Sequence, residues 1–408
     1  MRKWATLLLL WGVAWPAMAA KTLSIEQMEQ LLIKLHGKPD GKVAGELDDV
    51  QLTERASLAR LSRWEADFPG TRARQALMKL ADMSAFLNPP AVDVLRDPAP
   101  DVETQQRMTW MAEEYVKSTI MRLPDLLATR ETTHFEDTIS QRANYSVESM
   151  RSPGVDEHES LSALSVKPAG VASATEFKAL HSTGETSTTV IYRDGHELLD
   201  GDAGKRMKEE DPALGLTTSG EFGPTPGAVI GDVIQTGVSW LRWEQGSSEP
   251  VAVFHYAVPE GESHFRVGIT SGGKVQALYP AYHGELAIDP ETGAILRLSE
   301  VADMAPPHEK MQAALVVEYA PVTIGDRSYI CPVRGVAFSE TPVPGAGAAE
   351  DSAAPIQTEL NDVAFTHYRV FRSETRVVKG GSGASDATSA APNGTGTPDA
   401  APPASRPQ

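Results

Sequence analysis

Residues that could hold a metal ion form two weak patterns. Asp200-Gly201-Asp202-Ala203-Gly204 spaces two carboxylates like the start of a calcium loop, but the sixth position, where such a loop needs glycine, is Lys205. His255, His264 and His283 fall on or beside expected strands, where imidazoles could converge on zinc. Strand alternation can equally place them on opposite faces. We therefore predict no metal site and no cofactor.

The sequence lacks the motifs of the common catalytic families. It has no nucleophile elbow, no phosphate-binding loop ending in Gly-Lys-Ser/Thr, no Cys-x-x-Cys and no His-Glu-x-x-His. Cys331, the single cysteine, lies in an apolar, β-like context without an adjacent base, which indicates a buried, unreactive thiol. The 55 acidic residues make chance carboxylate pairs too abundant to identify a glycosidase site. These observations favour a protein that is not an enzyme.

Aromatic residues are concentrated in the second half of the chain. On a curved sheet they could line an apolar cavity that faces a ligand, and the alternative is that they build the core. Trp240 and Trp243 are three positions apart, so a regular strand would point them to opposite faces. The residues predicted to bind a ligand are Trp240, Trp243, Phe254, Tyr256, Phe265 and Tyr282.

A helical region over residues 20–123 precedes the strands that must position these aromatic residues. Ser24 and Gln27 form a capping box before a run of apolar residues at helical spacing. Similar segments begin at Thr53 and Thr71, and Asp101 caps a fourth helix. We predict that these helices form one helical domain.

From Leu126 the apolar period changes from about 3.6 to about 2, which indicates strands. Arg193-Asp194-Gly195-His196 is typical of a tight hairpin turn, and 226–234 fits a single helix packed on the sheet. Many strands joined by short turns imply an antiparallel sheet. The expected strands are 128–135, 187–192, 197–199, 239–244, 251–257, 264–270, 285–288, 294–301, 313–319, 328–338 and 363–378.

Three segments lack a regular apolar period. Residues 138–182 are rich in Ser, Ala and Gly, and residues 342–356 in Pro, Ala, Gly and Glu, so we interpret both as mobile insertions. Residues 379–408 are predicted to be a disordered tail. The fold class is therefore α+β, with the N-terminal helical region followed by a curved, half-barrel-like antiparallel sheet within residues 124–378.

The first nineteen residues have the pattern of a signal peptide. Arg2 and Lys3 precede a short apolar run, and Ala17-x-Ala19 is a cleavage signal. The run is about ten residues long, too short to span a membrane. We expect a periplasmic or secreted protein with no transmembrane anchor after cleavage. The full chain has a net charge of −18, which repels nucleic acid, so no nucleic-acid partner is expected.

The stretch from Tyr282 to Leu298, with its turn Asp289-Pro290-Glu291-Thr292-Gly293, resembles the strand-turn-strand unit of periplasmic lipoprotein-carrier and sigma-regulator sensor domains. That resemblance implies a curved antiparallel half-barrel closed over a helix, with an apolar cavity for acyl chains. Residues 218–224, 330–334 and 368–372 are similar to segments of exported bacterial proteins of unknown function, which implies no activity.

These patterns lead to one main expectation about function. We expect an exported, non-enzymatic envelope protein that binds an apolar ligand, such as a lipid or another apolar small molecule, or an envelope protein partner on a curved sheet. One alternative is an interaction scaffold that docks partners through the helical region. Another is a hydrolase whose active-site residues are dispersed along the chain.

Overall fold

A computed structural model of the chain describes residues 21–118, 123–138, 177–199, 216, 218, 220–247, 249–271, 274–342 and 356–370. The expected signal peptide and C-terminal tail lie outside the described residues, as do 139–176 and 343–355 of the expected insertions. All described residues belong to one compact unit.

Three N-terminal helices begin where the sequence indicates, at Ile25, Thr71 and Val102. The segment expected from Thr53 becomes helical only at Leu58, after the N-cap Ser57, and the helix Asp40–Leu47 was not predicted. Ser24 Oγ accepts a hydrogen bond from Gln27 N at 3.2 Å, and Ser24 N donates to Gln27 Oε1 at 3.0 Å, so the capping box is confirmed. The first four helices and two short parallel strands enclose one apolar core, and we call them the helical bundle. Its elements are β1 (Lys21–Leu23), α1 (Ile25–Leu35), α2 (Asp40–Leu47), β2 (Val50–Leu52), α3 (Leu58–Asp67) and α4 (Thr71–Met83).

The next helix packs elsewhere. After the short 3-10 helix η1 (Ala91–Asp93), α5 (Val102–Ser118) buries Met108, Ala112 and Val116 in the core of the sheet. The helices expected to form one domain over 20–123 thus contribute to two different cores. Helical periodicity defines an apolar face, but it does not say which surface that face covers.

Ten strands form one open antiparallel sheet, which confirms the α+β class. Their spatial order is β5-β4-β3-β14-β13-β12-β11-β10-β7-β6, and β8 and β9 form a separate hairpin. The strands are β3 (Leu126–Thr138), β4 (Phe177–Arg193), β5 (His196–Leu199), β6 (Val238–Gln245), β7 (Pro250–Val258), β8 (Val267–Ser271), β9 (Lys274–Leu278), β10 (Ala281–Ile288), β11 (Ile295–Asp303), β12 (Gln312–Ile324), β13 (Arg327–Pro342) and β14 (Ile356–Val370).

Several boundaries differ from the sequence expectation. Residues 177–182, expected within an insertion, form the first part of β4, and β14 begins at Ile356 rather than near 363. Both stretches mix polar and apolar residues without regular alternation, so the sequence did not indicate strands there. Pairing with a neighbouring strand stabilises them. Residues 264–266 precede β8 instead of forming a strand. The hairpin turn at Asp194 and Gly195 is confirmed, with φ of 51° and 79°.

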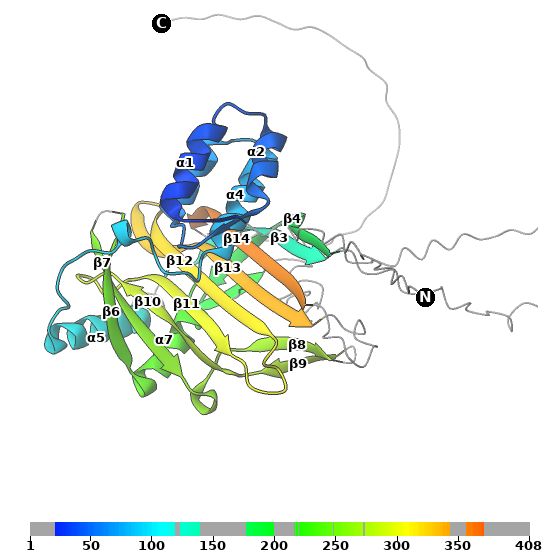
Figure 1. Cartoon of the computed structure of the whole chain (residues 1–408). Coiled ribbons are helices and arrows are strands. Elements are labelled where there is room, and N and C mark those ends of the chain that lie inside the picture. The colour runs from blue at the N-terminus through cyan, green and yellow to red at the C-terminus, as the bar shows by residue number, and fades with distance from the viewer. Residues whose placement is uncertain are drawn as a thin grey trace, which may run out of the picture. The chain divides into compact units, whose positions relative to one another are not determined.

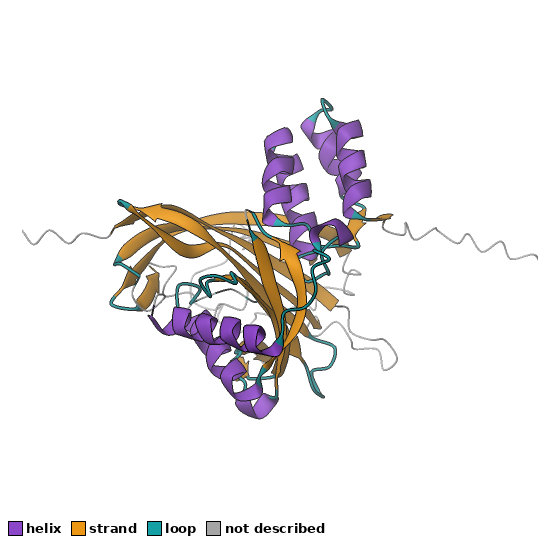
Figure 2. Cartoon of the chain, turned by 90° about the vertical axis from the view of Figure 1, so that its left-hand side faces the viewer, coloured by secondary structure: helices purple, strands orange, loops and turns teal. Residues whose placement is uncertain are grey.

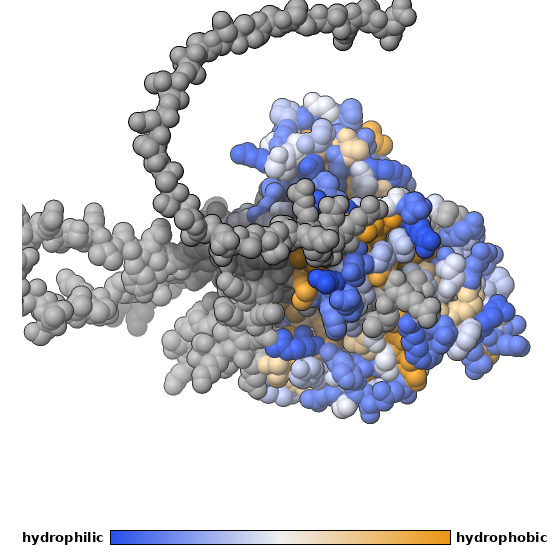
Figure 3. Space-filling model, turned by 180° about the vertical axis from the view of Figure 1, so that it is seen from behind, coloured by the Kyte–Doolittle hydropathy of each residue, from blue (hydrophilic) through white to orange (hydrophobic). Residues whose placement is uncertain are grey.

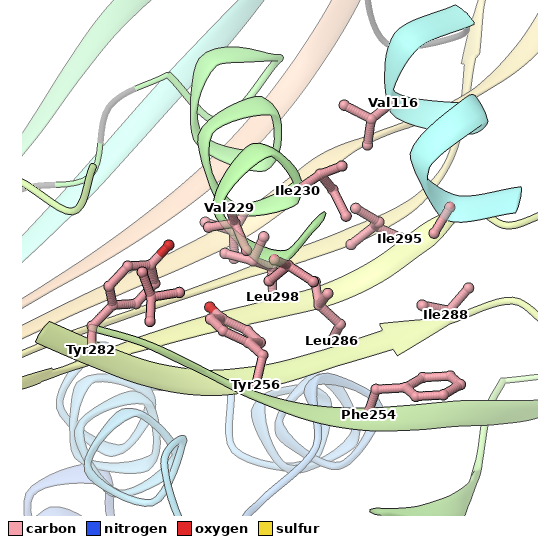
Figure 4. Packing of buried hydrophobic residues seen from close by; sticks show 14 of the residues in the cluster. Val116, Val229, Ile230, Phe254, Tyr256, Tyr282, Leu286, Ile288, Ile295 and Leu298 are labelled. Carbon is pink, nitrogen blue, oxygen red and sulfur yellow. The ribbon is translucent and has the colours of Figure 1, made fainter. Parts of the chain in front are cut away.

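The two faces of the sheet are covered by different helices. The sheet curves strongly, and α5 and α7 (Pro224–Thr236) lie on its concave face (Figure 2). In Figure 4, Val229 and Ile230 of α7 and Val116 of α5 point toward Leu286 and Leu298 of the sheet. The helical bundle contacts the convex face, above β12 and β13 (Figure 1).

The surface seen from behind is mostly hydrophilic, with small apolar patches among the described residues (Figure 3). None of the helices in the described ranges is long and apolar enough to cross a membrane.

Candidate functional site

The six aromatic residues predicted to bind a ligand lie together on the concave face. The ring centroid of Trp240 is 4.9 Å from that of Trp243 and 5.4 Å from that of Phe254. The ring of Tyr282 is 5.7 Å from Tyr256 and 5.5 Å from Phe265. We call these six residues the aromatic row. Alternation along β7 and β10 puts Phe254, Tyr256 and Tyr282 on one face, as period 2 requires.

The expectation that Trp240 and Trp243 point to opposite faces is wrong. The register between β6 and β7 shifts between Trp240 and Arg242, so Leu241 is the additional residue of a β-bulge. Trp240 pairs with Phe254, and Trp243 pairs with Ala252. Both of these partners belong to the concave core, so the bulge returns Trp243 to the face that Trp240 occupies.

The members of the aromatic row differ in accessibility. Phe254, Tyr256, Phe265 and Tyr282 are buried in the core that α5 and α7 complete. Trp240 and Trp243 are only partly buried at the end of this row, next to the sheet edge. A ligand that approaches from solvent therefore meets the tryptophan end first.

Trp243 lines a groove of about 540 Å³, which we call the Trp243 groove. Its indole Nε1 donates a hydrogen bond to the carbonyl oxygen of Pro98 at 3.1 Å, which joins the segment before α5 to β6. Four prolines give the groove rigid apolar walls. The lining residues are Asp97, Pro98, Ala99, Pro100, Trp243, Glu249, Pro250, Asp289, Pro290 and Glu291.

The charge of the Trp243 groove is negative. Asp97, Glu249, Asp289 and Glu291 line it, and its lining includes no lysine or arginine. Asp289 Oδ1 accepts hydrogen bonds from the backbone N–H groups of Glu291 and Thr292, at 2.9 and 3.0 Å, which fixes this turn. An indole face beside carboxylates attracts cations, through the ring quadrupole and through charge. The groove can therefore hold a cationic group whose neighbouring atoms are apolar.

A polar cluster lies at the opposite end of the aromatic row. Asp232 of α7 accepts hydrogen bonds from the Tyr282 hydroxyl at 2.8 Å and from His264 N at 3.0 Å. Its Oδ1 is 2.5 Å from His264 Nδ1. Asp232 is 1% exposed, whereas the His264 side chain is 68% exposed. The buried carboxylate thus orients an imidazole at the surface.

An aspartate on Nδ1 leaves Nε2 of a neutral histidine available as a base. Within the described residues, no hydroxyl or thiol forms a hydrogen bond with His264 Nε2. The described part of the chain gives the pair of Asp232 and His264 no nucleophile to activate.

Glu300 of β11 is a further acidic group in this region. Burial, and then the charge of Asp232, raise the pKa of Glu300 to about 8. Its carboxyl is therefore mostly protonated at neutral pH, which avoids an unpaired negative charge in the core. Asp232 and Glu300 were not among the residues predicted from the sequence. The sequence held one local indication of a buried acid. Glu300 lies two positions after Leu298 in an expected strand, so both side chains point to the same face.

The three histidines considered as zinc ligands do not converge. His255 and His283 are neighbours on the convex face, with ring centroids 6.2 Å apart, whereas His264 contacts Asp232 beside the concave core. In the described part of the chain, no group of three or more His, Cys, Asp or Glu side chains is placed to hold a metal ion. The calcium-like pattern at 200–204 lies outside the described residues.

An ionic network between the bundle and the sheet was also not predicted from the sequence. Arg55 of the bundle approaches Glu244 at 2.6 Å and Glu285 at 3.6 Å, and Arg242 and Arg297 contact the same two carboxylates. Arg242 and Glu244 flank Trp243 on β6. This alternation of charged and aromatic residues could have indicated from the sequence that one face of β6 is charged. Farther along the interface, Arg334 forms ion pairs with Asp82 and Asp362.

Comparison of the chain with protein-family models, with curated proteins and with solved structures found no match.

Proposed function

We propose that the protein is an exported, non-enzymatic binding protein that takes a basic segment of a partner polypeptide in the Trp243 groove. The position of Trp243 carries this proposal. It joins the predicted aromatic row to a groove that carboxylates surround, whereas four members of the row are buried.

The chemistry of the groove favours a polypeptide over an acyl chain. An acyl chain needs enclosed apolar space, but side chains of α5 and α7 already fill the concave face beside Phe254, Tyr256 and Tyr282. The groove is open and combines an indole with prolines and carboxylates. A lysine or arginine beside an apolar residue satisfies both features, because its charge meets the carboxylates and its stem covers the indole.

The size of the groove also suits a short peptide segment. Its volume of about 540 Å³ falls within the range typical of ligand sites, about 300–1,000 Å³. The walls come from three separate places in the chain: the segment before α5, the β6–β7 connection and the β10–β11 turn. Hydrogen bonds hold two of these walls in place before any ligand binds, which lowers the ordering cost of binding.

The test is fluorescence anisotropy with a labelled twelve-residue peptide of alternating lysine and proline. We expect the protein without its signal peptide to bind this probe and not the matched peptide of alternating glutamate and proline. Trp243→Ala should weaken binding about tenfold, as expected for a central aromatic contact. The double variant Asp97→Lys/Glu249→Lys should weaken it further, because it reverses the charge of the groove.

A matched control separates the groove from general acidity. Glu26→Lys/Glu46→Lys makes the same change in net charge on exposed positions of the helical bundle and should leave affinity nearly unchanged. If this control weakens binding as much as the groove variants, the groove is not the site and the peptide binds through the overall negative charge. If a fluorescent fatty acid binds and both peptides fail, the polypeptide proposal is wrong.

The export part of the proposal has a separate test. In a Gram-negative host, the protein recovered from the periplasm or medium should begin at Ala20, the residue after the Ala17-x-Ala19 signal. Retention of Met1 on protein confined to the cytoplasm would contradict export without bearing on the groove.

A further inference from the structure

We propose that the edge of β4 is a second binding site, at which an extended basic peptide adds to the sheet as a new strand. This inference goes beyond the Trp243 groove, which lies at the opposite end of the strand order. It rests on the backbone of β4 and on a groove beside it.

A long part of β4 has a backbone edge that pairs with no other strand in the described part of the chain. β4 pairs with β3 along most of its length, but β5 pairs only with its last four residues, from Val190 to Arg193. Among the described residues, no strand pairs with residues 184–189 on the side away from β3. This stretch contains neither proline nor lysine, which commonly protect natural sheet edges.

The direction of the backbone groups follows from the β4–β5 hairpin. Arg193 and His196 flank its two-residue turn, and residues in that position exchange both backbone hydrogen bonds. Because the direction alternates along a strand, Thr189, Ser187 and Glu185 also point their N–H and C=O groups away from β3. A register shift at Thr183 ends this regular stretch. The edge is therefore long enough for a strand of about five residues.

A groove beside this edge can receive side chains of the added strand. It has a volume of about 570 Å³ and lies on the convex face between the sheet and α3 and α4. Glu185 and Ser187 of β4 line it, and Gln75 of α4 donates a hydrogen bond to Glu185 at 3.1 Å. Alternate side chains of an added strand would project over the same face.

The charge in this second groove favours a basic occupant. Its carboxylates are Glu65, Glu131, Glu185 and Asp362, and Asp362 already pairs with Arg334. Arg74 and Arg334 also line the groove, and Arg74 Nε forms an ion pair with Glu65 Oε1 at 3.9 Å, so four carboxylates face two arginines. A lysine or arginine of the added strand would meet this excess of carboxylates over arginines, whereas a second copy of this acidic chain would be repelled.

The test uses the labelled peptide Thr-Val-Lys-Val-Lys-Val-Thr, blocked at both ends, with the protein lacking only its signal peptide. We expect binding by fluorescence anisotropy, together with slower hydrogen exchange at Glu185, Ser187 and Thr189. A peptide with glutamate in place of both lysines should not bind.

Ser187→Pro removes one outward N–H group without touching the ladder to β3, and proline is tolerated at such edge positions. It should weaken binding about tenfold, whereas the matched variant Ser187→Ala should bind like the wild type. Equal affinity of the two variants would overturn the proposal, as would slow exchange of the three amides before peptide is added. Because this peptide also has the chemistry that suits the Trp243 groove, all of these measurements are repeated in the Trp243→Ala background, so the edge and the groove can fail independently.

Discussion

Arg55 and Glu244 lie 189 positions apart in the sequence, and their side chains meet at 2.6 Å in the interface between the helical bundle and the sheet. Both side chains are less than one-tenth exposed. Arg242 and Arg297 contact the same glutamate, and Glu285 is the second carboxylate of the network. Three guanidinium groups thus share two carboxylates. Because the cations outnumber the carboxylates, Glu244 contributes more to the stability of the fold than Arg55 does.

We predict that Glu244→Gln destabilises the protein more than Arg55→Gln. Loss of Glu244 leaves three buried cations around Glu285, whereas loss of Arg55 leaves two cations and two carboxylates. Breaking a buried pair in an uncompensated way costs about 3–5 kcal/mol, and we expect about half of that for Arg55→Gln. Urea unfolding at pH 7 measures both values. A larger cost for Arg55→Gln would contradict the charge argument.

The same network predicts sensitivity to acid. Burial opposes ionisation of Glu244, but the guanidinium groups of Arg297 and Arg55 outweigh it and lower the pKa of Glu244 to about 2. The ionised carboxylate therefore stabilises the fold fully above the unfolded pKa of about 4.5, and this stabilisation is lost as pH falls toward 2. Unfolding measured between pH 6 and pH 3 should show a smaller decline in Glu244→Gln than in the wild type.

Glu300 predicts the opposite dependence on pH. Its pKa in the folded chain is about 8, above the unfolded value of 4.5, because of burial and then of Asp232. The associated stability is complete below about pH 4.5 and is lost as pH rises through about 8. Glu300→Gln should therefore reduce the decline in the free energy of unfolding between pH 5 and pH 9 by about 2–4 kcal/mol. Glu46→Gln, at an exposed position, is the control that should leave the decline unchanged.

At Gly293, the β10–β11 turn packs closely against the backbone of α5. A Cβ at this position would lie 2.4 Å from the carbonyl carbon of Met111, and the backbone φ is +75°. Gly293→Ala should cost about 1–3 kcal/mol and weaken peptide binding in the Trp243 groove, whose residues Asp289 and Glu291 lie in this turn. Thermal unfolding and anisotropy measure the two effects. Gly261→Ala adds the same methyl group where no atom lies within 4 Å, and it should change neither.

Cys331 is buried, as its sequence context indicated. Burial raises the pKa of its thiol to about 12, so little thiolate forms at neutral pH. We expect a thiol-reactive aromatic disulfide to label Cys331 at least about a hundredfold more slowly in the folded protein than in the protein unfolded in urea. Equal rates would show that the strands around Cys331 open readily.

The local features of this protein can be predicted from its sequence. The capping box at Ser24, the hairpin turn after Arg193, the helix within α7 and the inward positions of Phe254 and Tyr256 all follow from spacing and turn chemistry over a few residues. These signals are local, so they specify elements and faces. The same local signals were enough to predict the α+β class and to select the aromatic residues that lie together in the fold.

Which apolar and charged faces meet depends instead on contacts between segments that are distant in the chain. The apolar stripe of α5 fits a bundle or a sheet equally well by sequence, and the fold places it on the concave face. One bulge residue, Leu241, reverses the expected direction of Trp243 and places it at the groove. The pairing of Arg55 with Glu244 depends on segments far apart in the chain. Such contacts leave no periodic trace in the sequence, because they arise only when separate surfaces meet.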